Sequence, residues 1–340
     1  MALLMGGPSR EHNVSLLSGK TVAEHIDKER YCVIPVIISE DFFCSVFDYD
    51  KFPASKISDF EYWIGLVPKL PICETFDKLK KQKIDIVFVC MHGEYGEDGT
   101  VQALLETYKI PYTGSKMLPS GIAMDKIVYK QVLNASGVVT PESIFFFTDP
   151  LIDKNKLIRE VESELGFPCV LKTPSSGSSI GVELCENFDR LVENVEKLFG
   201  YQHKLFAEKY ISGREFTCAV LGNSHSDEII PLPPTEIICN NRFFDFEAKY
   251  TPGMAEEVTP AKIDDSLTEA IQNLAVKVHN LLGCRGLSRT DMIVENDRVF
   301  VLETNTIPGM TDQSLLPKAA VAAGMTIGEL IDKIVRFGLL

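Results

Sequence analysis

Short apolar runs that alternate with helical stretches dominate the first hundred residues, and two of these runs end in glycines. One such run occupies residues 2–7 (ALLMGG), a second lies at 33–38 (VIPVII), and a third leads through residues 84–90 into the glycine-rich segment 92–99. Strands that alternate with helices are typical of an open parallel sheet, whose ligands bind outside the carboxyl ends of its strands. We therefore predict an α/β fold with a ligand site beside the two glycine-rich turns.

The length of the chain, 340 residues, exceeds what one ordinary hydrophobic core can hold and suits two or three domains. The alternating pattern stops near residue 117, where a smaller α+β pattern begins. From about residue 205 several strands, a polar loop, a long helix and two final strands follow. We expect an N-terminal α/β domain over residues 1–116, a central α+β domain over 117–207 and a C-terminal α+β domain over 208–340.

Charge and cysteine usage exclude several classes of protein. The formal net charge of -14 argues against binding to a nucleic-acid backbone, which requires a basic face. No apolar run reaches the roughly 18 residues that span a bilayer, and the N-terminal run lacks the basic lead and the cleavage site of a signal peptide. Nine scattered cysteines without a Cys-x-x-Cys pair fit a reducing cytoplasm. We expect a cytoplasmic protein that binds neither nucleic acid nor a membrane.

The two final strands, residues 289–295 (RTDMIVE) and 299–305 (VFVLETN), carry a set of oxygen ligands. If residues 296–298 form a three-residue hairpin loop, Asp291 lies directly opposite Glu303, and the two-residue period adds Asn305 to the same face. Like charges in that position are destabilising unless something offsets them. A Mg²⁺ ion with nucleotide phosphates would do so. An exposed face with solvated carboxylates is the alternative, and the residues alone leave both open.

The loop at residues 174–181 (PSSGSSIG) has the glycine and hydroxyl content to fold over phosphates, although most such stretches are plain flexible loops. The phosphate-binding pattern that ends in Gly-Lys-Thr is absent, because Val14 stands where it requires glycine. The dinucleotide pattern Gly-x-Gly-x-x-Gly is absent as well.

Five further side chains are candidates, each with an ordinary structural alternative. Two lysines at element ends could neutralise phosphate charge or be solvated. Two glutamates could accept hydrogen bonds from an adenine amine and a ribose, or be strand-end acids. One histidine could polarise a substrate or cap a strand. The lysines are Lys126 and Lys172, the glutamates are Glu208 and Glu215, and the histidine is His92.

Taken together, the motifs resemble the D-alanine–D-alanine ligases of the ATP-grasp superfamily, in the order that this family has them. The resemblance covers nearly the whole chain. Its segments are residues 5–15 (MGGPSREHNVS), 92–100 (HGEYGEDGT), 111–114 (PYTG), 124–126 (MDK), 246–250 (FEAKY) and 303–310 (ETNTIPGM).

The resemblance implies a three-domain ATP-grasp architecture in which ATP is held between the central and C-terminal domains. Lys126 and Lys172 would hold the ATP phosphates, and Glu208 and Glu215 would hold adenine and ribose. Two Mg²⁺ or Mn²⁺ ions would be bound by the set of oxygen ligands that the strand pairing places on one face. That set is Asp291, Glu303 and Asn305.

The resemblance also implies roles around the two amino acids. Glu11 would bind the ammonium of the first D-alanine, and His92 would lie near its carboxylate. Ser314 would bind the carboxylate of the second D-alanine. Ser178 and Tyr250 would join Glu11 in a hydrogen-bonded set that closes the polar loop 239–260 over the site.

The implied chemistry is attack of the first carboxylate on the γ-phosphate, followed by attack of the second amine on the acyl-phosphate. Lys249 would reach the transferring phosphate. Arg289 and the backbone N–H of Gly309 would stabilise the tetrahedral oxyanion. Because water would hydrolyse the acyl-phosphate, loop closure has a physical purpose.

Tyr250 indicates D-alanine at both positions, whereas relatives that make the D-alanyl-D-lactate ester carry another residue there. A D-alanine–D-serine or D-alanine–D-lactate ligase is the alternative within the family. Another carboxylate–amine ligase and a catalytically inactive nucleotide-binding module are more distant alternatives. The family implies a homodimer, and activation by a monovalent cation stays open.

Overall fold

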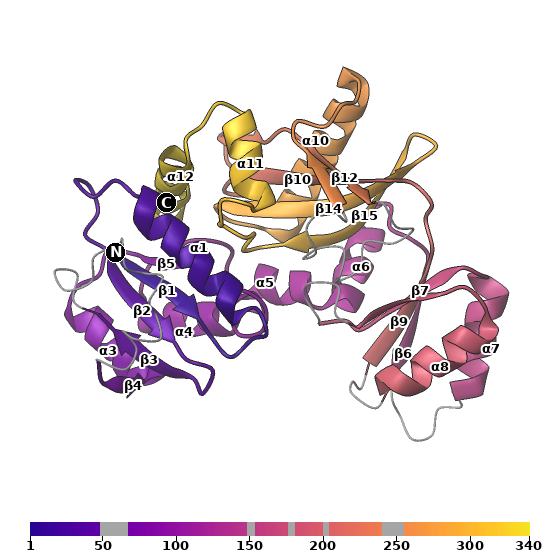
Figure 1. Cartoon of the computed structure of the whole chain (residues 1–340), viewed down its shortest axis with the longest axis horizontal. Helices are drawn as coiled ribbons and strands as arrows, with labels where there is room; N and C mark the ends of the chain where they lie inside the picture. The colour runs from indigo at the N-terminus through magenta and orange to yellow at the C-terminus, as the bar shows by residue number, and fades with distance from the viewer. Residues whose placement is uncertain (48–66, 148–153, 176–180, 200–203, 240–254) are drawn as a thin grey trace.

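The computed structural model describes residues 1–47, 67–147, 154–175, 181–199, 204–239 and 255–340. Its strands form three sheets. In Figure 1 the N-terminal sheet lies at the left, the C-terminal sheet in the middle and the sheet from the middle of the chain at the right. Among these residues no helix is long and apolar enough to cross a membrane.

The N-terminal sheet has five strands in the order β4-β3-β2-β1-β5. β1 pairs in parallel with β2 and β5, whereas β2–β3 and β3–β4 are antiparallel. The expected open parallel sheet is therefore parallel over three strands only, because the short hairpin connection after β2 reverses the chain. The strands are β1 (Ala2–Gly6), β2 (Ile34–Ile38), β3 (Phe43–Val46), β4 (Lys69–Pro71) and β5 (Val87–Val89).

Helices cover both faces of this sheet because successive side chains of β1 point to opposite sides. Leu3 and Met5 pack with α1 and α12, and Ala2 and Leu4 pack with α3 and α4. Figure 1 shows α12, the last helix of the chain, beside α1. The helices are α1 (His12–His25), α3 (Ile72–Lys81), α4 (Thr100–Tyr108), α11 (Leu315–Ala322) and α12 (Ile327–Leu339).

The first glycine turn leaves β1 at a point where only glycine fits. Gly6 has a φ of +86°, and a Cβ atom built on it would overlap the carbonyl oxygen of Ile38 on the neighbouring strand. The next N–H group, that of Gly7, donates to the same oxygen at 2.7 Å. This tight turn leads to Glu11, the N-cap residue of α1.

The middle of the chain forms a four-stranded antiparallel sheet in the order β6-β9-β7-β8. α7 and α8 supply the apolar side chains that cover it, in a core separate from those of the other two sheets. The elements are β6 (Ser143–Phe147), α7 (Lys154–Glu164), β7 (Cys169–Lys172), β8 (Val182–Cys185), α8 (Phe188–Phe199) and β9 (Lys204–Lys209).

The third sheet has the order β13-β12-β10-β14-β15, with β11 paired to β10. α10, α5 and α6 pack against it in one core, and α5 and α6 lie beneath it in Figure 1. The elements are α5 (Met117–Met124), α6 (Lys126–Ala135), β10 (Arg214–Gly222), β11 (Ile229–Pro231), β12 (Thr235–Cys239), β13 (Ala255–Val258), α10 (Asp265–Leu282), β14 (Leu287–Glu295) and β15 (Arg298–Asn305).

The hairpin β14–β15 confirms the predicted pairing of Asp291 with Glu303, but the predicted three-residue loop was wrong. Glu295 pairs with Arg298, so the connection has two residues, Asn296 and Asp297, both with positive φ. Positive φ at both positions is typical of the tight hairpin turn that matches strand twist. A register shift after Asp291 then restores the pairing, since a bulge inserts one extra residue in one strand.

The turn after β1 yields a stability prediction. Gly6→Ala adds a clash with a strand carbonyl to the cost of positive φ, whereas the exposed Gly137 has a φ of +67° and nothing within 4 Å of an added Cβ. Gly137→Ala should lose about 1–2 kcal/mol of unfolding free energy from backbone conformation alone. Gly6→Ala should lose about 1–3 kcal/mol more from overpacking. Urea denaturation measures both; equal losses would contradict the close approach.

Candidate active site

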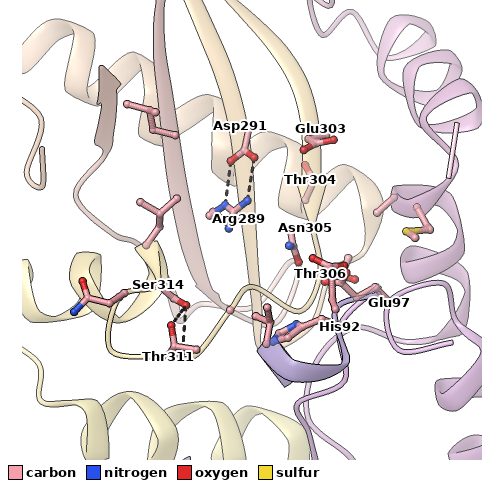
Figure 2. A pocket seen from close by; sticks show the side chains of 18 of the residues that line it. His92, Glu97, Arg289, Asp291, Glu303, Thr304, Asn305, Thr306, Thr311 and Ser314 are labelled. Carbon is pink, nitrogen blue, oxygen red and sulfur yellow. Dashed lines mark hydrogen bonds and ion pairs between the residues drawn. The ribbon is translucent and has the colours of Figure 1, made fainter. Parts of the chain in front are cut away.

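A cavity of about 460 Å³ lies where the carboxyl ends of the N-terminal strands face the third sheet. Figure 2 shows its polar side chains, with Arg289, Asp291 and Glu303 on the two long strands and His92 and Glu97 across from them. Ten residues singled out from the sequence line it: Glu11, His92, Lys126, Glu215, Arg289, Asp291, Glu303, Asn305, Gly309 and Ser314.

Two carboxylates approach each other around Gly93, at the edge of the cavity formed by the second glycine turn. The N–H of Gly93 donates to Glu97 Oε2 at 2.8 Å, and a Cβ on Gly93 would lie 2.7 Å from Glu11 Oε2. The other oxygen of Glu97, Oε1, is buried and receives no hydrogen bond from the described residues. Burial, with the nearby Glu11 carboxylate second, raises the pKa of Glu97 to about 8, so this side chain is largely protonated at neutral pH.

His92 is buried, and both of its ring nitrogens are engaged inside the protein. Nδ1 lies 3.1 Å from the carbonyl oxygen of Ile307, and Nε2 lies 2.8 Å from the hydroxyl of Ser18. Burial lowers the pKa of His92, although Glu11 acts in the opposite direction. The ring is therefore neutral, and the histidine joins α1, the glycine turn and the segment after β15.

Arg289 and Asp291 form a bidentate ion pair on β14. The guanidinium donates from Nε and Nη2 to the two carboxylate oxygens, at 3.0 Å each (Figure 2). Thr217 on β10 donates its hydroxyl to Asp291 Oδ1 at 2.5 Å. Burial alone would lower the pKa of Arg289, but Asp291 and the neighbouring carboxylates outweigh it and raise that pKa above its usual value. The cation is held rigidly at the cavity wall.

The second acidic side chain of the pair is balanced by a different cation. Lys126 Nζ lies 3.1 Å from Glu303 Oε2. Asp125 caps α6 by accepting from the N–H groups of Ile127 and Val128, so Lys126 is the first helical residue and faces the hairpin. The opposed carboxylates Asp291 and Glu303 therefore each have their own cation, which removes the repulsion expected of like charges on neighbouring strands.

A buried network of charged side chains includes Lys172, one of the two lysines predicted to bind phosphate. Glu208 on β9 forms ion pairs with Lys130 on α6, at 2.8 Å, and with Lys172 at the end of β7. Burial alone would raise the pKa of Glu208, but Lys130 and Lys172 outweigh it and keep that pKa below its usual value. Two cations around one anion leave a net positive charge beside the entry to the segment after β7.

The segment after β15 forms a tight turn that closes the cavity on the side of α11. Ser314 is the N-cap residue of α11, and its hydroxyl lies 2.7 Å from that of Thr311 and accepts from the Thr311 N–H at 3.1 Å. A Cβ on Gly309 would lie 2.7 Å from Ser314 Oγ. Asn305 accepts from the Ile307 N–H at 2.9 Å, which bends the chain out of the strand.

Three of the predicted residues, Ser178, Lys249 and Tyr250, lie outside the described residues. Glu215 lines the cavity from β10, while Glu208 and Lys172 belong to the charge network. Among the described ranges no three His, Cys, Asp or Glu side chains are grouped closely enough to hold a metal ion.

Sequence reasoning missed several polar side chains of this region, among them four that adjoin Glu11, His92, Glu208 or Asp291. Some signals for them exist in the sequence. Lys130 follows Lys126 by one helical turn, Thr217 follows Glu215 by one strand period, and Glu97 lies inside a segment that carries the family resemblance. The four are Ser18, Glu97, Lys130 and Thr217.

Comparison with known proteins gives a match over the whole chain. A family model described as "D-ala D-ala ligase N-terminus" matches residues 1–115, and one described as "D-ala D-ala ligase C-terminus" matches residues 132–336. The D-alanine–D-alanine ligase of Syntrophobacter fumaroxidans is 40% identical over 342 residues, which cover 100% of this chain and 97% of that protein.

Solved structures show the same fold. The VanG D-Ala:D-Ser ligase of Enterococcus faecalis superposes with a TM-score of 0.84 at 28% identity, covering 99% of this chain and 98% of that one. The D-alanine–D-alanine ligase of Bacillus anthracis, in a complex with ATP, has a TM-score of 0.75 at 31% identity and covers 99% and 96%.

Glu97 yields a prediction on pH dependence. Its folded-state pKa of about 8 lies above the ordinary value of 4.5, so its protonation stabilises the fold fully at low pH and this stability is lost as pH rises toward 8. Glu97→Gln removes that dependence. The unfolding free energy of the variant minus that of the parent should therefore increase as the pH is raised from 5 to 8, by on the order of a few kcal/mol. Thermal unfolding without nucleotide or metal measures this.

The matched control is Glu94→Gln, an exposed glutamate in the same segment. It should follow the parent at each pH. A difference between Glu97→Gln and the parent that is the same at pH 5 and pH 8 would contradict the assignment of a protonated Glu97.

Proposed function

Because this chain belongs to the D-alanine–D-alanine ligase family, we propose that its cavity joins two D-alanine molecules into D-alanyl-D-alanine. The enzyme is an ATP-dependent ligase that forms a peptide bond for cell-wall synthesis, and ATP is converted to ADP and phosphate. The observation that carries the assignment is the full-length match to such ligases at 40% identity. The convergence of carboxylates, lysines and an arginine in one cavity supports it.

The nucleotide would lie between the four-stranded sheet and the third sheet. Lys126 and Lys172 would hold its phosphates, and the net positive charge of the Lys130–Glu208–Lys172 network supports this role. Glu208 would accept from the adenine amine and Glu215 from the ribose, since both are strand residues with carboxylate acceptors. Burial of the lysines strengthens their attraction for phosphate, because the local dielectric is lower than that of water.

The residues at the hairpin fit a magnesium site. Asp291 and Glu303 offer carboxylate oxygens and Asn305 an amide oxygen, and Mg²⁺ in nucleotide sites takes one or two carboxylates together with phosphates and water. Two carboxylates are therefore enough to hold the ion, and a third carboxylate is not needed. Mg²⁺, or Mn²⁺ in its place, would screen the phosphate charge during transfer. On loading, the carboxylates would exchange part of their contact with Arg289 and Lys126 for the ion.

The first D-alanine would bind near α1. Glu11, at the N-cap, would accept from its ammonium, and the neutral Glu97 beside Glu11 avoids a second negative charge there. The carboxylate of this D-alanine would then point toward the phosphates between His92 and Arg289. Its attack on the γ-phosphorus forms an acyl-phosphate and releases ADP.

The second D-alanine would bind at the start of α11, with its carboxylate on Ser314. Its amine attacks the carbonyl carbon of the acyl-phosphate and gives a tetrahedral oxyanion. The two bonds to Asp291 leave Nη1 of Arg289 for another acceptor, so Arg289 and the Gly309 N–H would stabilise this oxyanion together. Collapse breaks the C–O bond to phosphate and yields the dipeptide.

Ser178, Lys249 and Tyr250 would complete the site by closing it against water, as the family resemblance implies. Tyr250 supports a dipeptide product. A D-Ala:D-Ser specificity is the second candidate, because the VanG enzyme has this fold and one added hydroxyl is weakly discriminated by many pockets. We also propose the three-domain division at residues 116/117 and 207/208, a homodimeric assembly and a cytoplasmic location, where ATP is supplied.

Product analysis tests the function. With ATP, Mg²⁺ and D-alanine the enzyme should release phosphate and give a D-Ala-D-Ala mass. L-Alanine should give no release. Added D-lactate should yield no ester, and added D-serine should yield less mixed dipeptide than D-Ala-D-Ala. Phosphate release that does not depend on D-alanine would overturn the substrate assignment.

Glu303→Gln tests the metal site. The amide cannot supply the second anionic ligand, so the variant should lose dipeptide synthesis while circular dichroism shows a folded protein. Asp297→Asn, in the turn of the same hairpin and outside the cavity, is the matched control and should keep parental activity. Full activity of Glu303→Gln would refute the assignment of the metal ligands.

A further inference from the structure

We propose that Ser18 is a positioning residue of this ligase: through His92 it holds the turn Ile307–Met310, which presents the Gly309 N–H to the reacting carbonyl. This inference rests on the proposed function for the role of Gly309. It adds a residue outside the segments that carry the family resemblance, since Ser18 follows the first of them by three positions.

Ser18 lies within α1, fully buried, and its hydroxyl contacts both sides of the junction between the N-terminal domain and the third sheet. It is 2.8 Å from His92 Nε2 and 3.2 Å from the N–H of Met310. His92 Nδ1 in turn lies 3.1 Å from the Ile307 carbonyl oxygen. The two ends of the four-residue turn are thus tied to one serine–histidine pair, and Gly309 lies between these ends.

The direction of each hydrogen bond in this series, from Met310 through Ser18 and His92 to Ile307, follows from what each partner can donate or accept. The carbonyl oxygen of Ile307 can only accept, so His92 Nδ1 carries the proton. The Met310 N–H can only donate, so Ser18 Oγ accepts from it. Because the buried ring is neutral, Nε2 is unprotonated and accepts from the Ser18 hydroxyl. The order is Met310 N–H to Ser18 O–H to His92 Nε2, and His92 Nδ1–H to Ile307.

Removal of the Ser18 hydroxyl takes away the partner that the described residues give to Met310 N–H and to His92 Nε2. Met310 N–H and His92 Nε2 are both buried, and each would lose its hydrogen bond at once. An unsatisfied buried polar group costs free energy that the turn can recover by moving. The turn would shift toward solvent or toward the ring, and the Gly309 N–H would leave the direction it needs, since an oxyanion donor must be aimed before the reaction.

The same geometry changes the expected role of His92. Both ring nitrogens are committed to Ser18 and Ile307, so neither faces a substrate carboxylate as a free donor or acceptor. His92 acts through the turn, as a rigid spacer between α1 and the strand end. Arg289 and Gly309 remain the groups that touch the reacting atoms.

Ser18→Ala tests this role against a matched control. Ser15 lies three residues earlier on the same helix, is equally buried, and its hydroxyl donates to the Cys90 carbonyl at 2.8 Å and accepts from the Gly6 N–H at 2.7 Å. Ser15→Ala therefore loses two buried hydrogen bonds, as Ser18→Ala does, but neither of them involves the Ile307–Met310 turn. Their stability losses should be similar, and only Ser18→Ala should lower kcat for the dipeptide, by about 10–100-fold.

The two chemical steps separate positioning from general damage. Acyl-phosphate formation, followed by positional isotope exchange in ¹⁸O-labelled ATP with D-alanine, does not use the oxyanion turn. It should persist in Ser18→Ala with the KM for ATP unchanged, while dipeptide formation slows. Parental kcat in Ser18→Ala would overturn the proposal. An equal loss of both steps, or an equal loss of kcat in Ser15→Ala, would overturn it too.

The tautomer of His92 gives a readout that needs no substrate. Nitrogen NMR of protein labelled with ¹⁵N-histidine, assigned through a His92→Gln variant, should show a proton on Nδ1 and none on Nε2. The Nε2 signal should move in Ser18→Ala and stay in Ser15→Ala. A proton on Nε2 in the parent would overturn the hydrogen-bond chain. The expected tautomer in a protein that makes no dipeptide would instead refute the proposed function, and the Gly309 role with it.

Discussion

The opposition of Asp291 and Glu303 on neighbouring strands is the constraint around which this site is built. Two carboxylates at paired positions repel each other, and each is balanced by a cation from a different place in the chain. Arg289 comes from the same strand two residues away, and Lys126 comes from the first turn of α6. One charge balance thus fixes Arg289 at the cavity wall and holds the first turn of α6 against the β14–β15 hairpin.

The cavity depends on three parts of the chain meeting at one place. α12 returns to pack against α1 on the N-terminal sheet, so the last helix of the described residues stabilises the helix that begins at Glu11. His92 and Ser18 then join the N-terminal part to the turn after β15 by directed hydrogen bonds. Apolar packing is non-directional, whereas the hydrogen bonds fix how the two parts are oriented to each other.

Buried charge is distributed so that no part of the site is an isolated ion. Glu208 lies between two lysines, Asp291 between Arg289 and Thr217, and Glu97 is kept neutral beside Glu11. An unpaired buried charge would be far more costly than any of these pairs. The arrangement leaves positive charge where phosphates are expected and neutral or negative groups where an ammonium is expected.

Sequence by itself determined most of the elements, the family and most of the cavity's charged side chains, because strand and helix periodicity and the glycine turns are local properties of the chain. It also predicted the Asp291–Glu303 pair, although through a loop one residue too long that a bulge later offset. Only the tertiary structure decided that β3 and β4 run antiparallel and that Lys130 contacts Glu208. It alone also brought Ser18 to Met310, 292 positions away. Such contacts depend on which faces of distant elements meet, and packing of the whole chain decides that.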